Sequence, residues 1–358
     1  MKNSIRVGVV GCGYWGPNLI RNFYNLPDCD LKAICDLDIQ RLNHLKSLYA
    51  KVDISTQFQE FVARTDIDAL VIATSATTHF MMAKEALLAG KHVFIEKPMA
   101  TSAAECDELV ELAAKRGLTL MVGHTFLYSA PVRRIKDIID SGDIGEIRYI
   151  NARRLNLGLF QRNINVTWDL APHDISIILY VTGLLPQSVN CQGNSHVTKG
   201  VEDVTNMSMN FQRGMFATLQ NSWLDPRKVR EMTIVGSRRM IVYDDVQPLE
   251  KVRIYDTRVE TLPHYDTFGE FHFAYHYGDS YIPYIKQEEP LKVECQHFLD
   301  CIRKSTKPLT DGIHGSNVVR VLEACSRSLR QNGASVSFEP SRHAALPATN
   351  GTPKLAKT

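Results

Sequence analysis

The sequence lacks the cysteine pattern of a disulfide framework. None of its eight cysteines forms a C-x-x-C pair. Cys12, Cys35 and Cys191 sit in apolar or turn contexts that favour small buried side chains. We therefore expect free thiols and a reducing, cytoplasmic environment.

Long apolar runs and strong charge are missing as well. The longest apolar stretch, around Ile175–Leu185, is short and interrupted by Ser and Thr, so it cannot span a bilayer. The first residues run directly into a strand-like segment and leave no room for a signal peptide. The net charge of +2 gives no electrostatic reason to expect binding to nucleic acid or to a membrane surface. We expect a soluble cytoplasmic protein that binds neither.

The chain is long enough for two domains. It has 358 residues, of which 44% are hydrophobic and 22% charged, a composition typical of globular proteins. Up to about residue 122, apolar strand-like runs alternate with amphipathic helical segments. Such repeated β-α-β units predict an α/β domain at residues 1–122, with a doubly wound parallel sheet covered by helices on both faces.

A different pattern begins near residue 123. Several segments alternate apolar and polar residues, as in Asn206–Phe211, and turn signals such as Arg213–Gly214 divide them. We therefore expect residues 123–340 to form an α+β domain with a large, mostly antiparallel open sheet. A free sheet face of that size predicts a homo-oligomer. Residues 341–358 have little apolar content and are expected to form a disordered tail.

The most informative stretch is Ile5–Gly16, IRVGVVGCGYWG. Its β-branched run breaks into Gly11, Gly13 and Gly16, the G-x-G-x-x-G spacing, and a segment of helical period follows. Strand, glycine turn and helix in this order are the context of the dinucleotide-binding fingerprint, in which the helix start binds a pyrophosphate. Asp36 lies where a carboxylate accepts the ribose hydroxyls of NAD and repels the 2′-phosphate of NADP. The pattern predicts an NAD site; the alternative is an ordinary βα turn followed by a solvated Asp.

A lysine follows the predicted strand His92–Ile95, in the tripeptide Glu96-Lys97-Pro98. A side chain at the carboxyl end of a parallel strand points into the crevice where the cofactor lies. Its ammonium can donate to a substrate hydroxyl and to the nicotinamide ribose, and partial burial would lower its pKa. The alternative is a surface Glu-Lys pair beside a turn.

A carboxylate and an imidazole stand four residues apart in WDLAPHD, at Asp169 and His173. This spacing puts both on one face of a helix or of its entry turn. Histidine can exchange a proton near neutral pH, and an Asp one turn away can orient a sugar hydroxyl or hold the imidazole. The alternative is a histidine that caps a helix start.

Taken in order, the glycine motif, the acidic residue after the second strand, E-K-P and D-x-x-x-H resemble the Gfo/Idh/MocA family over nearly the whole chain. The resemblance implies an N-terminal Rossmann domain, and dimers or tetramers formed through the open sheets of the C-terminal domains. It also implies NAD(P)-dependent oxidation or reduction of a sugar or cyclitol carbon. By position, His173 is then the general base for the hydroxyl proton, Lys97 polarises the same oxygen, and Asp169 holds a neighbouring hydroxyl.

The resemblance extends to residues that line the cofactor and the substrate. Ser75-Ala76 replaces the Pro-Asn of the Thr-Pro-Asn turn found in many members, which makes the positions around it a departure from the pattern. The expected cofactor-binding residues are Gly11, Gly13, Tyr14, Trp15, Gly16, Asp36, Thr74, His79, Glu96 and Lys97. The expected substrate contacts are His124, Arg153, Asn156, Arg162 and Trp168. An arginine on such a strand or loop is more often solvated, which is the alternative there.

The chain is also similar to the nucleotide-sugar branch of that family, through the segments GYWGPN and WDLAPHD. Members of that branch oxidise the 3-hydroxyl of a UDP-sugar such as UDP-N-acetylglucosamine or its uronate, and Arg153, Arg154 and Arg162 could meet the diphosphate. This similarity implies an NAD-dependent 3-dehydrogenase. An inositol or free-sugar dehydrogenase, a hydrolytic use of bound NAD, and a non-catalytic NAD-binding regulator are the alternatives. A regulator would be expected to lose the lysine or the histidine.

One aromatic and histidine-rich segment, His264–Tyr284, lies outside these motifs. His272 and His276 could chelate a metal if they lay on a helix, but no Cys or carboxylate partner stands at a suitable spacing. We therefore expect no metal and interpret the segment as an aromatic loop that covers the site or packs between subunits.

Overall fold

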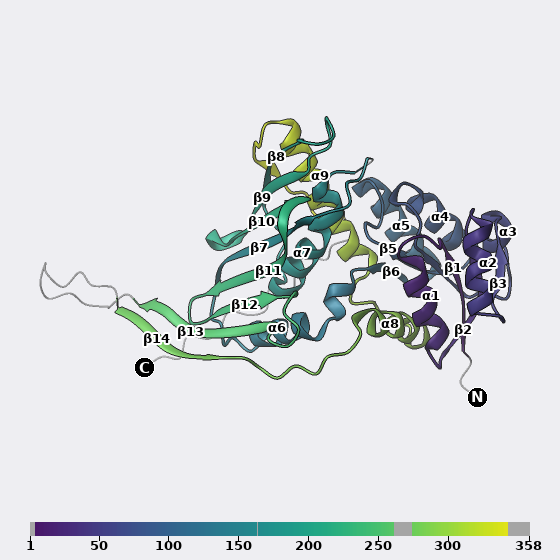
Figure 1. The fold of residues 1–358 in the computed structure, drawn as a ribbon, viewed down its shortest axis with the longest axis horizontal. Helices are drawn as coiled ribbons and strands as arrows, with labels where there is room; N and C mark the ends of the chain where they lie inside the picture. The colour runs from purple at the N-terminus through teal and green to yellow at the C-terminus, as the bar shows by residue number, and fades with distance from the viewer. Residues whose placement is uncertain (1–3, 163, 261–273, 343–358) are drawn as a thin grey trace, which may run out of the picture.

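The computed structural model describes residues 4–162, 164–260 and 274–342, which build two sheets joined through helices (Figure 1). The first sheet has six parallel strands in the order β3-β2-β1-β4-β5-β6, which is the Rossmann order. Its elements are β1 (Ile5–Val10), α1 (Gly16–Asn25), β2 (Cys29–Cys35), α2 (Ile39–Leu48), β3 (Asp53–Ser55), α3 (Phe58–Val62), β4 (Ala69–Ile72), α4 (Ala76–Leu88), β5 (His92–Glu96), α5 (Ala103–Arg116) and β6 (Leu120–Gly123). The predicted parallel sheet is confirmed.

Strand β1 determines where this sheet binds a ligand. It pairs with β2 on one side and with β4 on the other, so the strand order reverses beside it. Val9 and Val10 point to opposite faces of the strand and both are buried, as a central parallel strand requires. The carboxyl ends of β1 and β4 therefore open the crevice at which doubly wound sheets bind their ligands.

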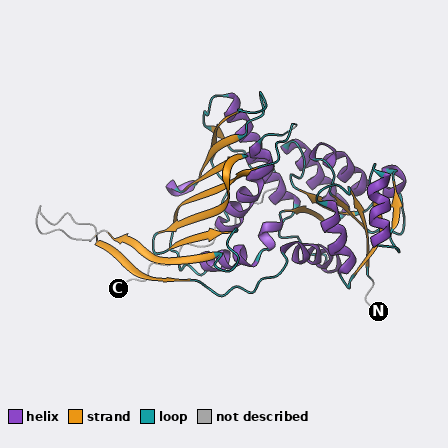
Figure 2. Cartoon of the chain, viewed as in Figure 1, coloured by secondary structure: helices purple, strands orange, loops and turns teal. Residues whose placement is uncertain are grey.

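The second sheet has nine strands in the order β14-β13-β12-β11-β7-β10-β9-β8-β15. Strands β7 and β10 pair parallel and the other neighbours pair antiparallel, which confirms the mostly antiparallel sheet. The helices lie on the side of this sheet that faces the Rossmann domain (Figure 2). The elements are η1 (Thr125–Tyr128), α6 (Ala130–Asp140), β7 (Ile147–Leu157), α7 (Val166–Thr182), β8 (Ser188–Asn194), β9 (Val204–Asn210), η2 (Gln212–Gly214), β10 (Phe216–Ser222), β11 (Leu224–Gly236), β12 (Met240–Asp244), β13 (Val252–Glu260), β14 (Ala274–Tyr281), α8 (Pro290–Lys304), α9 (Gly312–Arg330) and β15 (Val336–Ser337).

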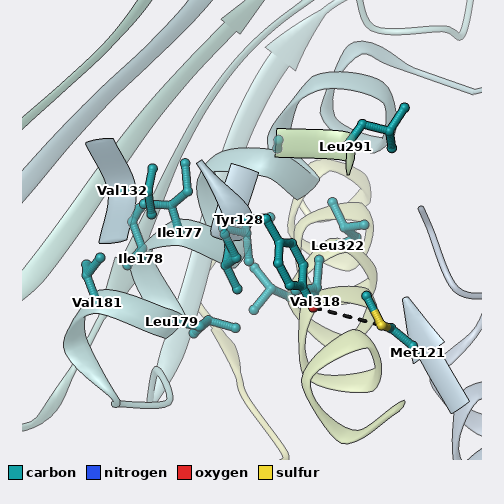
Figure 3. Packing of buried hydrophobic residues seen from close by; sticks show 14 of the residues in the cluster. Met121, Tyr128, Val132, Ile177, Ile178, Leu179, Val181, Leu291, Val318 and Leu322 are labelled. Carbon is teal, nitrogen blue, oxygen red and sulfur yellow. Dashed lines mark hydrogen bonds between the residues drawn. The ribbon is translucent and has the colours of Figure 1, made fainter. Parts of the chain in front are cut away.

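The last two helices return to the Rossmann domain. Phe298 of α8 is fully buried and lies edge-on to Phe23 and Phe94, with ring centroids 6.4 and 5.7 Å away. The segment before α9 pairs with β6, where the Val122 N–H donates to the Thr310 carbonyl at 2.8 Å. Figure 3 shows the resulting cluster, in which Met121 of β6 and Tyr128 meet Val318 and Leu322 of α9. The C-terminal helices of residues 123–340 therefore also pack against the core of the first domain.

The first residue of the predicted tail, residues 341–358, is packed against the protein. Ser341 is buried, and its hydroxyl donates to the Asp107 carboxylate at 3.0 Å. Residues 343–358 lie outside the described residues. Ser341 therefore belongs to the folded part of the chain.

The segment His264–Tyr284 differs from the predicted loop over the site. Its described part holds β14, which pairs antiparallel with β13 and extends away from the Rossmann domain (Figure 1). His276 stands on this strand, with Nε2 3.3 Å from the Asp256 carboxylate, so the helical spacing needed for chelation is absent there. His272 lies outside the described residues.

Candidate active site at the junction of the two sheets

The glycine turn packs tightly against the protein at Gly11 and Gly16 but leaves free space beside Gly13. Gly11 has φ +97°, and a Cβ there would lie 2.6 Å from the Ala73 backbone; a Cβ at Gly16 would lie 2.0 Å from the Gly11 carbonyl oxygen. A Cβ at Gly13 would meet only the Arg41 guanidinium, at 3.8 Å. Helix α1 begins at Gly16 without a side-chain cap, so its first N–H groups remain for a pyrophosphate. These residues fit a dinucleotide.

Asp36 is fixed beside this turn. Its carboxylate accepts hydrogen bonds from the Cys12 N–H at 2.6 Å and from the Asp38 N–H at 2.8 Å. The negative charge therefore stands at a defined position at the end of β2, where the adenosine ribose of a dinucleotide binds. Tyr14 and Trp15 border the same turn and are exposed to 90% and 38%.

Lys97 and Asp169 meet across the junction of the domains. The Lys97 ammonium follows β5 and donates to the Asp169 backbone carbonyl at 3.0 Å, with the Asp169 carboxylate 3.7 Å away. The same carboxylate accepts from the indole N–H of Trp223 at 3.1 Å. Trp223 is buried after β10, which no spacing in the sequence indicated. Two elements far apart in the chain thus hold the Asp169 carboxylate beside the ammonium.

His173 lies one helical turn after Asp169 in α7, beyond the internal Pro172. Burial lowers the pKa of His173 well below its ordinary value, and the positive charges of Lys97 and Arg154 lower it further. Its Nδ1 is buried and has no hydrogen-bond partner among the described residues. The imidazole is therefore neutral at pH 7 and can accept a proton.

Two buried carboxyl groups lie beneath Lys97. Burial raises the pKa of Glu96 to about 7, although the Lys97 charge opposes the shift. Glu294 of α8 accepts from the Thr125 hydroxyl at 2.7 Å, and burial together with Glu96 raises its pKa well above the ordinary range. The sequence pattern pointed to Glu96 but not to Glu294, which comes from the opposite end of the chain.

His79 supports the site through the backbone. It is buried, and its Nδ1 and Nε2 lie 2.8 Å from the Pro98 carbonyl and 3.2 Å from the Thr74 carbonyl. It thus ties the loop after β5 to the end of β4. The Thr74 hydroxyl lies 2.8 Å from that of Thr78. The Lys97–Pro98 bond is cis.

Of the expected substrate contacts, His124 interacts electrostatically with both Lys97 and His173. It is buried beside His314 of α9, with ring centroids 5.3 Å apart, and neither of its nitrogens has a partner among the described residues. The Lys97 charge contributes to lowering the His124 pKa, after burial and His314. His314 carries no sequence signal, because it stands far along the chain in an ordinary helix start.

The other expected contacts lie on α7, on β7 and in the loop that follows β7. The Trp168 indole donates to the Ser326 hydroxyl at 2.9 Å, which ties α7 to α9. Arg153 points to the open face of the second sheet and pairs with Glu231. Arg154 is buried against Asp174 and cannot reach a diphosphate. Asn156 is half-buried near the end of β7, and Arg162 is exposed in the loop that follows.

Further features of the described ranges bear on the class of protein. Within them, no helix combines the length and the apolar character needed to cross a membrane. In the same ranges, no three His, Cys, Asp or Glu side chains come together in a way that could hold a metal ion. All eight cysteines are free thiols.

A Rossmann sheet with an open glycine turn, joined to Lys97, Asp169 and His173 at its strand ends, defines a nicotinamide-dependent oxidoreductase. Residues 5–124 match the family described as "Oxidoreductase family, NAD-binding Rossmann fold", and residues 132–242 match the "GFO/IDH/MocA C-terminal domain". The chain belongs to the Gfo/Idh/MocA family of oxidoreductases.

The proteins similar to this chain include sugar and cyclitol dehydrogenases. An uncharacterized oxidoreductase, YrbE of Bacillus subtilis, is 26% identical over 95% of this chain and 98% of its own length. UDP-N-acetylglucosamine 3-dehydrogenase of Acidithiobacillus ferrooxidans is 26% identical over 88% and 94%. Its solved structure, GnnA, has a TM-score of 0.77 at 25% identity, covering 92% of this chain and 98% of that one. Myo-inositol 2-dehydrogenase of Thermotoga maritima is 24% identical over 91% and 97%.

Proposed function

We propose that the protein is an NAD-dependent dehydrogenase that oxidises a secondary hydroxyl, at C3, of a nucleotide sugar such as UDP-N-acetylglucosamine or its uronate. The observation that carries the proposal is the convergence of Lys97, Asp169 and His173 at the carboxyl ends of the Rossmann strands. A neutral imidazole can accept the hydroxyl proton, a positive donor can polarise the same oxygen, and a carboxylate can hold a neighbouring hydroxyl.

The chemistry follows from these three groups. Bound NAD supplies the acceptor for the hydride that leaves the carbinol carbon with its electron pair. His173 takes the hydroxyl proton, so that the C–O single bond becomes a carbonyl. The Lys97 ammonium donates to the same oxygen, using an N–H that the Asp169 carbonyl does not occupy. Asp169, held by Trp223, is placed to accept from a neighbouring hydroxyl.

The substrate class is supported by the relatives. Two of them, at similar identity, act on UDP-N-acetylglucosamine and on myo-inositol according to their names, and both align over most of this chain. A free inositol is therefore the second candidate. The GYWGPN and WDLAPHD segments favour the nucleotide sugar.

The deciding experiment follows reduced nicotinamide by its absorbance, with purified protein, NAD and a panel of UDP-sugars, inositols and hexoses. We expect turnover with UDP-N-acetylglucosamine or its uronate, lost in Lys97→Met and His173→Asn. It should be retained in Lys84→Met, which removes an ion pair with Glu108 and a contact with the Phe80 ring on α4. Turnover restricted to unphosphorylated polyols would refute the nucleotide-sugar proposal. If the cofactor is reduced and reoxidised without release, the absorbance does not change, and mass spectrometry of the sugars then detects the reaction.

Preference for NAD over NADP is expected to depend on Asp36. Asp36→Asn removes the charge that opposes a 2′-phosphate and keeps one oxygen, which can accept from either the Cys12 or the Asp38 N–H. The ratio of NAD to NADP affinity should fall about tenfold, equivalent to ~1.4 kcal/mol. Titration calorimetry with both dinucleotides measures it, and Asp30→Asn, at an ion pair on the same strand, is the control. An unchanged ratio would mean that another group excludes the phosphate.

We further propose that the open sheet face joins subunits into a dimer or tetramer. Tyr149 and Phe216 are exposed on this face and stack with centroids 5.6 Å apart, beside uncharged Asn151 and Thr218. Arg153 and Glu231 on the same face pair with each other, so their opposite charges offset and the face can meet its own copy. Light scattering should give at least twice the chain mass of 40.4 kDa. Thr218→Arg should reduce it to one chain, whereas Ser47→Arg on α2 should not. A monomeric wild type would contradict the proposal.

A further inference from the structure

Four side chains beside the active site form a closed network of contacts, namely those of His173, Phe126, Arg154 and Asp174. The rings of His173 and Phe126 lie 5.0 Å apart at 61°. The Arg154 guanidinium lies over the Phe126 ring, 4.7 Å from its centroid. Arg154 also donates to both carboxylate oxygens of Asp174, at 2.8 and 2.9 Å. Asp174 follows His173 directly in α7, so one peptide bond closes the network.

Each side chain of this network restricts the orientation of the next. The Arg154–Asp174 pair is bidentate and buried, with side chains exposed to 5% and 7%, so the guanidinium plane is fixed. A guanidinium over an aromatic face is attracted by the ring, which holds Phe126 in η1 against β7. Phe126 in turn limits the rotation of His173. This restriction matters because His173 Nδ1 has no hydrogen-bond partner among the described residues that could fix the ring instead.

The network also places the positive charge of Arg154 near the base, His173. The groups that face His173 are Lys97, Arg154, His124 and Arg230, with Asp169 and Asp174 on its own helix. After burial and Lys97, Arg154 contributes most to the lowered pKa of His173. In the proposed reaction Lys97 donates to the substrate oxygen, whereas the buried Arg154 guanidinium donates to Asp174.

We propose that Phe126 and Arg154 are positioning residues for the base: Phe126 fixes the angle of the His173 imidazole, and Arg154 holds Phe126 and keeps a positive charge behind it. This inference rests on the proposed function, since it concerns the proton acceptor of that reaction. The two contributions are separable, because one is aromatic contact and the other is charge.

The orientation part is tested with Phe126→Leu and the ring-preserving Phe126→Tyr. We expect Phe126→Leu to lower kcat about tenfold with little change in KM, as a misplaced catalytic group does, and Phe126→Tyr to restore most of it. In the free protein, NMR of the histidine rings should show loss of the Phe126 ring-current shift on His173, whose signal is identified by its absence in His173→Asn. An unchanged kcat together with an unchanged His173 signal would overturn this part.

The charge part is tested in the free protein, without substrate. Arg154→Met combined with Asp174→Asn removes both charges, so neither is left buried alone. The His173 titration should move up toward its ordinary range. Arg133→Met is the matched control, because Arg133 lies over the Tyr128 ring in the same η1 segment, 5.5 Å from its centroid. An equal titration in both variants would overturn the charge part. Since no turnover is needed, this result stays distinct from a failure of the proposed substrate.

Discussion

Replacing His173 by asparagine is expected to reduce kcat/KM for alcohol oxidation at least about 100-fold, because the hydroxyl then has no positioned proton acceptor. The affinity for NAD should be retained, since Gly11, Gly13 and Asp36, which fit the cofactor, lie on the other domain. Initial rates and titration calorimetry measure the two quantities separately. His44→Asn, at an exposed histidine of α2, is the control. Full activity of the His173 variant would place the base elsewhere.

The pH dependence follows from the same residue. A base works in its neutral form, above its pKa, and the pKa of His173 is lowered by burial, Lys97 and Arg154. Oxidation should therefore fall off only at pH values below the ordinary histidine range of about 6.5. The pKa of Glu96, at about 7, can add a limb near neutrality. That limb should vanish in Glu96→Gln, whereas the acid limb of His173 should stay. An acid limb at the ordinary histidine position in both proteins would contradict this assignment.

Phe298→Ala is expected to lower the free energy of unfolding by about 3–5 kcal/mol, the cost of removing a fully buried aromatic side chain. The loss affects both domains at once, because Phe298 of α8 fills the space against Phe23 and Phe94 of the Rossmann core. Urea unfolding followed by fluorescence and by circular dichroism measures it.

Two further variants set the scale for that measurement. Phe298→Leu keeps much of the volume and should lose less. Leu249→Ala, at a side chain that is 83% exposed, should change the free energy by no more than about 0.5 kcal/mol. A loss below ~1 kcal/mol for Phe298→Ala would show that the two helical layers pack independently of this ring.

The local elements could be predicted because each follows from short-range pattern. The glycine after α5 is an example: Gly117 adopts φ +66° and ends the helix, the conformation that glycine favours at a helix C-terminus. The return of α8 and α9 to the first domain could not be predicted. Their apolar faces have ordinary helical spacing, and nothing in that spacing says which sheet they cover.

The candidate site shows the same division. Lys97, Asp169 and His173 could be chosen because chemistry-bearing residues at strand ends and at helical spacing are readable from the sequence. Trp223 and His314 could not, since each reaches the site by long-range packing. Arg153 and Arg154 differ only in strand parity: one faces the open sheet surface and the other the helices. The register of β7 decides which is which, and the sequence alone left that open.

The return of α8 has a consequence for the order in which the protein is made. Phe23 and Phe94 leave the ribosome early, but Phe298 follows only after β14 has been synthesised. A nascent chain that has not reached α8 exposes the apolar surface around these two rings, which is the kind of surface that chaperones hold. The domain that stands first in the sequence is therefore completed only when α8 and α9 emerge.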